Sequence, residues 1–319
     1  MDLQQRALRS GVDYVAQKFA RTTAAQYIPE KQAMPAAVTT VPLSVHAHGV
    51  PNWIDLHTAS IADARRFYEA LLGWSFQGRL TLASIPLDHG DPGPGLQGAT
   101  TAMARLDDGP AAEFIERGES FGDMALLSNW IPYVYVDDLP ATLSLVEASG
   151  GLVASPPARR GDMAMVATII DPNDAPLCLW QPLTLTGAAI HRPGALTWIE
   201  LETPDLDMAA KFYGELFGWD AGQVTLNNDV GEEIYTLFTK NGERVAGAVQ
   251  TAMPGMDASW SPAFLVPDVD AAAAVCSANG GVQMAEPFDI PVGRQAVLVD
   301  PGGAAFSILG PRCHRPRPL

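Results

Sequence analysis

The chain has 319 residues, a formal net charge of −16 and 47% hydrophobic residues. The acidic balance argues against a nucleic-acid partner, because the phosphate backbone favours surfaces rich in lysine and arginine. No apolar run reaches the roughly 18 residues that a membrane span needs. The three cysteines stand far apart without a CxxC pair, which indicates a reduced, cytoplasmic protein.

An N-terminal segment, residues 1–48, lies outside the organisation of the rest of the chain. Apolar residues recur at helical spacing between Leu3 and Phe19, and basic residues occupy the other faces. This pattern predicts an amphipathic helix over residues 3–20, followed by a proline-containing linker. The helix is expected to pack on its own domain or on a partner subunit, with a pocket lid as the alternative. The segment lacks the apolar core of a signal peptide.

The rest of the chain repeats itself. The stretch around Trp53 returns around Trp198, and the stretch that ends at Trp74 returns with its end at Trp219. Both pairs have the same offset, since 198 − 53 and 219 − 74 both equal 145. A whole unit is therefore duplicated, and an internal repeat of this length determines the architecture before any single residue is weighed.

A later pair of stretches, around Trp130 and Trp260, supports the same duplication. Six of the seven tryptophans fall in matched pairs, and Trp180 is left over. The repeat predicts two similar domains, residues 49–185 and 190–312.

Each repeat is predicted to begin with a strand and a helix. Residues 52–58 alternate in polarity and are rich in β-forming residues, which indicates a strand. The helix that follows has one apolar face and is expected to end at Gly73, and the second copy repeats this scheme up to Gly218. Short strands come next, and the Asn241-Gly242 pair predicts a tight hairpin between two of them.

The later part of each repeat follows the same order. Residues 133–136 are predicted to form a strand and residues 139–149 a helix, with further strands around the Asp171-Pro172 turn; the sequence around Asp300 echoes it. Each half therefore contains two β-α-β-β-β modules. One module cannot bury its sheet face alone, so two are expected to pair into a curved eight-stranded sheet around a cavity. The predicted fold class is α+β.

These signatures resemble the vicinal-oxygen-chelate superfamily, which includes glyoxalase I, bleomycin- and fosfomycin-resistance proteins and extradiol dioxygenases. Residues 67–74, their copy at 212–219 and the late Asp-Pro turns carry the resemblance, which covers about residues 50–312. It implies tandem glyoxalase-like domains made of four modules paired into two cups. It does not imply one function, because this superfamily includes isomerases, dioxygenases, thiol transferases and drug-binding proteins.

The resemblance also implies a divalent metal held by His, Gln or Glu side chains that project into the cup. The corresponding positions supply no such set: Trp53, Ile131 and Cys178 in the first half, and Trp198, Ser261 and Ser307 in the second. Glu113 matches one remaining ligand position and cannot hold a metal firmly alone. No metal and no cofactor are therefore expected. An unorthodox site of His46, His48 and His57 would require the linker to bring them together.

Aromatic and acidic side chains mark the candidate ligand sites. Strand alternation puts Trp53, Asp55 and His57 on one face of the first sheet. It puts Trp198, Glu200 and Glu202 on the matching face of the second sheet. An aromatic wall with a few directional polar groups suits an organic ligand. The further ligand-binding candidates are Glu113, Tyr133 and Trp180.

Both faces have a catalytic and a structural interpretation. Asp55 could orient His57 as a general base, since an imidazole near its ordinary pKa transfers protons well at neutral pH; Glu200 and Glu202 are the acidic candidates of the second face. The structural alternative places the tryptophans in the core and bonds Glu200 to a neighbouring strand. Arg159-Arg160-Gly161 is interpreted as a hairpin turn, with anion contacts as the alternative.

The first domain is expected to contain the main ligand cavity. It has the acid-imidazole pair, the N-terminal segment and a longer Gly/Pro/Asp-rich loop at residues 88–95, and loops on a rigid scaffold often carry function.

Three functions remain open from the sequence. The favoured function is a metal-independent enzyme that transfers protons on an organic metabolite, such as an isomerase, cyclase or lyase. The second is sequestration of a drug or metabolite without catalysis, and the third is a metal-dependent dioxygenase or glyoxalase-like lyase with displaced ligands. A small organic molecule is the expected partner, with no nucleic acid and no membrane, and a homodimer is compatible with the sequence.

Overall fold

The computed structural model describes residues 46–81, 100–107, 109–116, 128–228, 231–251, 258–290 and 292–312. The predicted N-terminal helix and the loop at residues 88–95 lie outside these ranges. Within them, no helix is long and apolar enough to cross a membrane.

The first sheet has eight strands in the order β2-β3-β4-β1-β5-β8-β7-β6. Its elements in chain order are β1 (Pro51–Thr58), α2 (Ile61–Leu72), β2 (Ser75–Thr81), β3 (Thr100–Leu106), β4 (Gly109–Glu116), β5 (Asn129–Tyr135), α3 (Leu139–Ala148), β6 (Leu152–Arg160), β7 (Ala164–Ile170) and β8 (Pro176–Pro182).

The second sheet follows the same plan, in the order β10-β11-β12-β9-β13-β17-β16-β14, with β15 paired to β16 as a ninth strand. Its elements are β9 (Leu196–Thr203), α4 (Leu206–Phe217), β10 (Asp220–Asn228), β11 (Gly231–Lys240), β12 (Glu243–Gln250), β13 (Ser259–Leu265), α5 (Val269–Ala278), β14 (Val282–Gln283), β15 (Phe288–Ile290), β16 (Gly293–Val299) and β17 (Ala305–Gly310).

Two modules join at the middle of each sheet. Strand β1 runs parallel to β4 of its own module and antiparallel to β5 of the next, and β5 runs parallel to β8. Strands β9, β12, β13 and β17 repeat this arrangement. The predicted α+β fold with paired modules is therefore confirmed, and the ninth strand is its one addition.

The local signals of the sequence act as expected. Ser60 caps α2 by accepting a hydrogen bond from the backbone N–H of Asp63, and Gly73 ends this helix with φ of 70°. Such a left-handed conformation favours glycine, which has no Cβ. The hairpin between β11 and β12 turns at Asn241 and Gly242, with φ of 52° and 82°. Two successive positive φ values explain the Asn-Gly pair.

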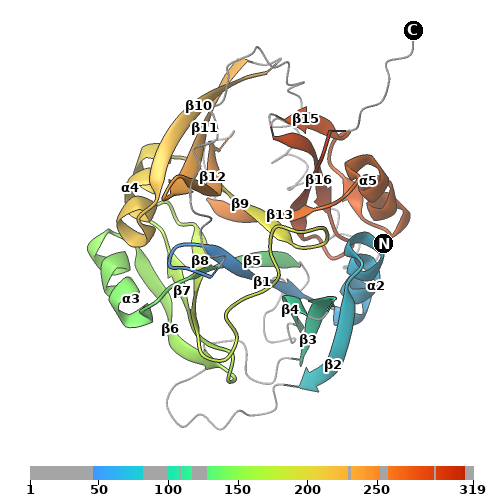
Figure 1. The fold of residues 1–319 in the computed structure, drawn as a ribbon, viewed down its shortest axis with the longest axis horizontal. Coiled ribbons are helices and arrows are strands. Elements are labelled where there is room, and N and C mark those ends of the chain that lie inside the picture. Colours follow the sequence, from blue (N-terminus) through green and yellow to red (C-terminus); the bar gives the residue numbers. More distant parts are fainter. Residues whose placement is uncertain are drawn as a thin grey trace, which may run out of the picture.

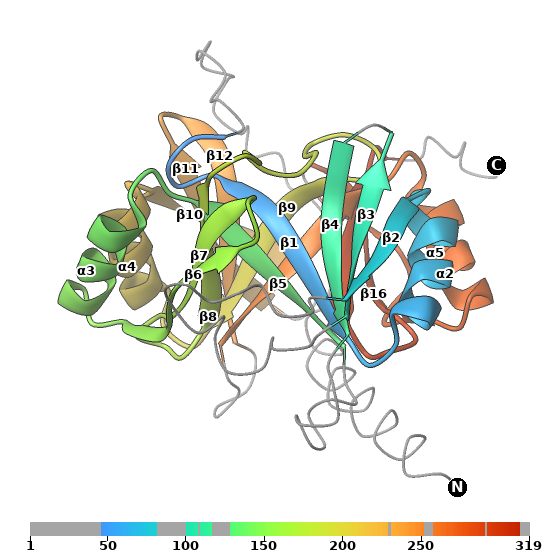
Figure 2. The ribbon, with the colours of Figure 1, turned by 90° about the horizontal axis from the view of Figure 1, so that it is seen from below.

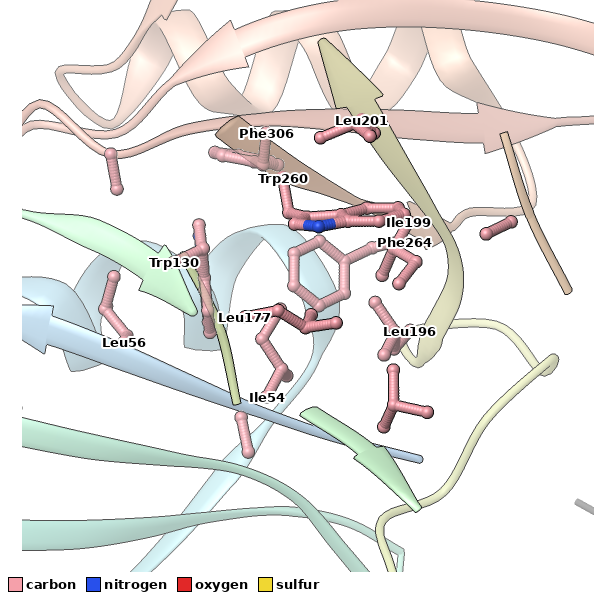
Figure 3. Close-up of a cluster of buried hydrophobic side chains, with 14 of the residues drawn as sticks. Ile54, Leu56, Trp130, Leu177, Leu196, Ile199, Leu201, Trp260, Phe264 and Phe306 are labelled. Carbon is pink, nitrogen blue, oxygen red and sulfur yellow. The ribbon is translucent and has the colours of Figure 1, made fainter. Parts of the chain in front are cut away.

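The two domains lie against each other (Figures 1 and 2), and they share one hydrophobic core. Helix α2 packs beside α5 at one end of the molecule, and α3 packs beside α4 at the other (Figure 2). Trp130, Phe264 and Trp260 meet in this core together with Ile54 and Leu177 (Figure 3). The ring centroids of Trp130 and Phe264, from different domains, lie 5.2 Å apart.

Hydrogen bonds across the core are reciprocal. The hydroxyl of Tyr68 on α2 donates to Asp300 of the second domain at 3.0 Å, and that of Tyr213 on α4 donates to Asp171 of the first at 2.9 Å. Trp130 donates its indole N–H to the Tyr68 hydroxyl at 3.0 Å, and Trp260 does the same to Tyr213. The residues that reveal the repeat in the sequence therefore build the contact between the two domains.

Candidate functional site

Each sheet has a second face, opposite the shared core, which we call its site face; it carries Trp53 and Asp55 in the first sheet and Trp198 and Glu200 in the second. In the first sheet this face is filled by aromatic rings. Trp53 stacks on Trp180 with ring centroids 4.7 Å apart, and Tyr133 meets Trp180 edge to face at 5.9 Å. All three side chains are buried. Trp180, the tryptophan without a counterpart in the repeat, thus helps to fill the first site face.

A buried ionic network lies beside these rings. Strands β1 and β4 place Asp55 and Glu113 side by side in the parallel register. Arg160, at the end of β6, donates from Nη2 to Asp55 at 2.8 Å and to Glu113 at 2.7 Å, and from Nε to Glu113 at 2.9 Å. Asp55 also accepts hydrogen bonds from Trp53 Nε1 at 2.9 Å and from the Tyr133 hydroxyl at 2.5 Å.

The network raises the pKa of two of its members, Arg160 and Tyr133. Burial opposes the charge of Arg160, but the carboxylates of Asp55 and Glu113 outweigh it and hold the pKa of the guanidinium above its ordinary value. Burial and the charge of Asp55 raise the pKa of Tyr133 well above its usual range, so the phenol keeps its proton and donates it.

The connection between the two sheets covers the first site face. The Trp180 indole donates to the carbonyl of Leu185 at 3.1 Å, and the Asn52 side chain donates to the carbonyl of Thr186 at 2.7 Å. The backbone N–H of Ala188 donates to the carbonyl of Asn52 at 2.8 Å. Leu185 and Ala188 pack against the aromatic cluster. In the described part of the chain, the first face is thus closed by its own residues.

The structure places the candidate residues of the first half as follows. Asp55 is held by Trp53, Tyr133 and Arg160, and it is fully buried. His57 is half-buried at the far end of β1, opposite Asn129 of β5. Arg160 is the last residue of β6. The anions that it contacts are the carboxylates of Asp55 and Glu113. A repeat shows which residues correspond, but it does not show which side chains of one copy reach each other.

The site face of the second sheet has smaller residues at the matching positions. By strand register, Gly247 stands where Glu113 stands, Ala263 where Tyr133 stands, and Leu309 where Trp180 stands. Trp198, Glu200 and Glu202 are correspondingly half-buried, whereas Trp53 and Asp55 are fully buried. The structure therefore brings Trp198, Glu200 and Glu202 together on a face that keeps access to solvent.

Polar groups complete this second face. The Trp198 indole donates to the hydroxyl of Tyr235 on β11 at 3.1 Å. Ser261 of β13 is the register partner of Glu200. Gln295 of β16 donates to the hydroxyl of Ser307 on β17 at 3.1 Å. An aromatic surface, a carboxylate and several hydroxyl and amide groups can hold an organic ligand by stacking and directional hydrogen bonds.

Tyr235 is a residue of this face that the sequence did not single out. A Cβ added to Gly247 would lie 1.9 Å from the Tyr235 hydroxyl oxygen, so the phenol lies directly over this glycine. A glycine inside a strand marks a close approach of this kind, and Gly247 in the predicted strand was the signal for it.

Replacing Gly247 with alanine is expected to displace the Tyr235 ring without unfolding the domain, because only the far end of one half-buried side chain must move. We expect a loss of about 1 kcal/mol of stability or less and an altered near-ultraviolet circular dichroism signal from Trp198 and Tyr235. Gly222→Ala is the control, since its Cβ would contact only the Leu237 carbonyl at 3.9 Å. An unchanged spectrum for Gly247→Ala would contradict the placement of Tyr235.

Neither site face fits a divalent metal. Among the described residues, no three His, Cys, Asp or Glu side chains are grouped so that they could hold one. In the first sheet Arg160 already occupies both carboxylates, and burial raises the pKa of the Cys178 thiol to about 11, which disfavours a thiolate ligand. In the second sheet, the register partners of Glu200 are Gly247 and Ser261, and neither is a carboxylate, imidazole or thiol.

The three histidines of the unorthodox metal hypothesis are divided between the two ends of β1: His46 and His48 precede the strand, and His57 lies near its end. His48 precedes the strand, where its ring contacts the Leu216 carbonyl at 3.3 Å and the backbone N–H of Asp137 at 3.4 Å.

A fold of two sheets, each built from paired modules and offering one face to a ligand, is that of glyoxalase-type small-molecule-binding proteins. Residues 195–308 match the Glyoxalase/Bleomycin resistance protein/Dioxygenase superfamily. The chain is 35% identical to the Putative glyoxylase CFP32 of Mycobacterium tuberculosis over 270 residues, which cover 84% of this chain and 97% of that protein. The chain belongs to this superfamily, as the sequence signatures indicated.

Two further similarities extend the comparison. The Anthracycline biosynthesis protein DauV of Streptomyces sp. strain C5 is 29% identical over 273 residues, which cover 82% of this chain and 94% of that protein. The crystal structure of the 2,3-dioxygenase LapB from Pseudomonas sp. KL28 superposes with a TM-score of 0.56 at 15% identity, over 86% of this chain and 98% of that one. At that identity the structural likeness establishes the fold alone.

Proposed function

We propose that the chain binds an organic small molecule on the site face of the second sheet and transfers a proton on it without a divalent metal. The observation that carries this proposal is the contrast between the two faces. Trp53 and Asp55 are sealed among Trp180, Tyr133 and Arg160, whereas their counterparts Trp198 and Glu200 keep partial exposure.

The side chains of the second face have distinct roles in this proposal. Trp198 offers an aromatic ring for stacking, and its bond to Tyr235 fixes the orientation of both rings. Glu200 is the candidate proton acceptor, because a carboxylate within reach of an acidic C–H or O–H can act as a general base. Isomerisation, cyclisation and elimination all require such a step. Glu202, one strand alternation further on, is a second acidic group for a polar part of the ligand.

The relatives favour a planar, oxygenated ligand. DauV is described as a protein of anthracycline biosynthesis, and anthracyclines have flat fused rings with phenolic and carbonyl oxygens. Such a molecule matches an aromatic wall lined with hydroxyl, amide and carboxylate groups. Sequestration of a similar molecule without catalysis remains the alternative function, since binding uses the same face.

An anthracycline titration tests the binding part of the proposal. Trp198→Ala is expected to weaken binding about tenfold, which corresponds to about 1.4 kcal/mol, and His57→Ala is expected to bind like the wild type. Fluorescence anisotropy of the anthracycline measures both. Loss of binding in His57→Ala with full binding in Trp198→Ala would place the ligand on the first domain.

Proton exchange separates catalysis from sequestration. If Glu200 is the base, the wild type should exchange an acidic C–H of the bound ligand for deuterium in D₂O, and Glu200→Gln should bind normally but lose about 10²-fold or more of this rate. Proton NMR follows the exchange. A wild type that binds without any exchange above the buffer rate would favour sequestration.

A further inference from the structure

Asp55 and Glu113 form a buried pair of carboxylates on neighbouring strands of the first sheet. Their side chains are 0% and 6% exposed. Two carboxylates in such a place repel each other and lose their hydration, so they need a cation to remain charged. In this fold, that face of the sheet is where the superfamily resemblance expects a divalent metal.

Arg160 supplies the positive charge. Its side chain is 7% exposed, and one nitrogen, Nη2, lies 2.8 Å from Asp55 and 2.7 Å from Glu113. Nε adds a second bond to Glu113 at 2.9 Å, and Nη1 lies 3.4 Å from the Tyr133 hydroxyl. The guanidinium therefore bridges one oxygen of each carboxylate from within the sheet, with Nε and Nη2 both bonding Glu113 Oε2 and Nη2 also bonding Asp55 Oδ2.

We infer that Arg160 is a built-in cation that replaces a bound metal ion on the first site face, and that Asp55 and Glu113 form a cation-binding site whose resident is this guanidinium. The second sheet supports the assignment, because Gly247 stands in the register position of Glu113 and therefore pairs Glu200 with a residue that has no carboxylate. This inference is independent of the proposed function of the second face.

Removing the resident cation should expose the site to cations from solution. In Arg160→Ala, millimolar guanidinium chloride is expected to raise the Tm, measured against an equal concentration of sodium chloride, because a ligand that binds the folded state stabilises it. Manganese chloride, as a divalent probe, is expected to raise the Tm of the same variant. The wild type should respond to neither salt, since Arg160 already fills the site.

Arg294→Ala is the matched control. Arg294 also bonds two carboxylates, Asp270 at 2.8 Å and Asp289 at 3.0 Å, but its side chain is 20% exposed and that of Asp289 is 52% exposed. Water can replace this arginine, so neither salt should raise the Tm of the variant selectively. A response of Arg160→Ala no larger than that of Arg294→Ala, with both cations, would overturn the inference.

A second variant covers the case in which Arg160→Ala does not fold. The triple variant Arg160→Met, Asp55→Asn, Glu113→Gln removes the cation together with both charges that need it. It is expected to fold and to have a higher Tm than Arg160→Met alone, whose two carboxylates remain buried without a cation. If the triple variant is no more stable than Arg160→Met, charge compensation is not the role of Arg160 and the inference fails.

Discussion

Replacing Asp55 with alanine is expected to destabilise the protein by about 2–4 kcal/mol, whereas Glu200→Ala should cost less than about 1 kcal/mol. The two residues occupy the same position of the repeat, so the difference comes from their surroundings. Asp55→Ala leaves three buried donors, on Trp53, Tyr133 and Arg160, without their acceptor. Glu200 is half-buried beside Ser261 and Gly247, so water can reach the groups that the substitution would leave.

Urea unfolding of both variants measures this difference in stability. The anthracycline titration measures ligand binding, for which the larger effect is expected from Glu200→Ala. The folded molecules of Asp55→Ala should bind the anthracycline like the wild type. Glu200→Ala should lose affinity or turnover while it stays nearly as stable as the wild type. Equal destabilisation by the two substitutions would mean that the second face is as closed as the first. Loss of ligand binding in Asp55→Ala alone would move the site to the first domain.

Much of the fold could be predicted because large aromatic residues occupy the repeated positions. Trp74 and Tyr68 recur at a fixed offset, and they do so because they hold the two domains together. Trp74 donates to the Gly194 carbonyl at 2.7 Å, and its copy Trp219 donates to the Gly49 carbonyl at 2.7 Å. A reciprocal interface constrains both copies in the same way, so its residues stay recognisable in one sequence.

The site was harder to predict because it depends on differences between the copies. The sequence shows that Trp180 has no counterpart in the second copy, but its stacking on Trp53 can be seen only from the register of β5 and β8. Arg160 reaches Asp55 from 105 residues away along the chain, and no local pattern predicts that contact. Gly247 carried the clue to Tyr235, and only the strand pairing shows that it also stands in the position of Glu113.

Asp300 at the domain interface should give the protein a measurable pH dependence. Burial raises its pKa from 3.8 to about 6, although the backbone N–H groups of Ala304 and Gly302 and the Tyr68 hydroxyl lower it in part. Because the folded-state pKa exceeds the unfolded one, the folded protein binds this proton more tightly. The stabilisation from the proton is therefore complete below about pH 4 and is lost as the pH rises through about 6.

Asp300→Asn should remove this dependence, since an amide resembles the protonated acid. Its oxygen can still accept from the backbone N–H groups of Gly302 and Ala304, and its NH₂ group can donate to the Tyr68 oxygen. The change in the pKa of Asp300 from 3.8 to about 6 corresponds to about 3 kcal/mol. The stability of the variant relative to the wild type should therefore rise by up to this amount between pH 4 and pH 7, as measured by urea unfolding at each pH.

Asp171 offers an internal check on the same mechanism. It accepts from Tyr213 across the interface as Asp300 accepts from Tyr68, and burial raises its pKa as well. Asp171→Asn is therefore expected to shift the stability profile in the same direction. A stability difference between Asp300→Asn and the wild type that stays constant from pH 4 to pH 7 would show that Asp300 is charged throughout. The reciprocal tyrosine bonds would then be held by a carboxylate that tolerates its burial at every pH.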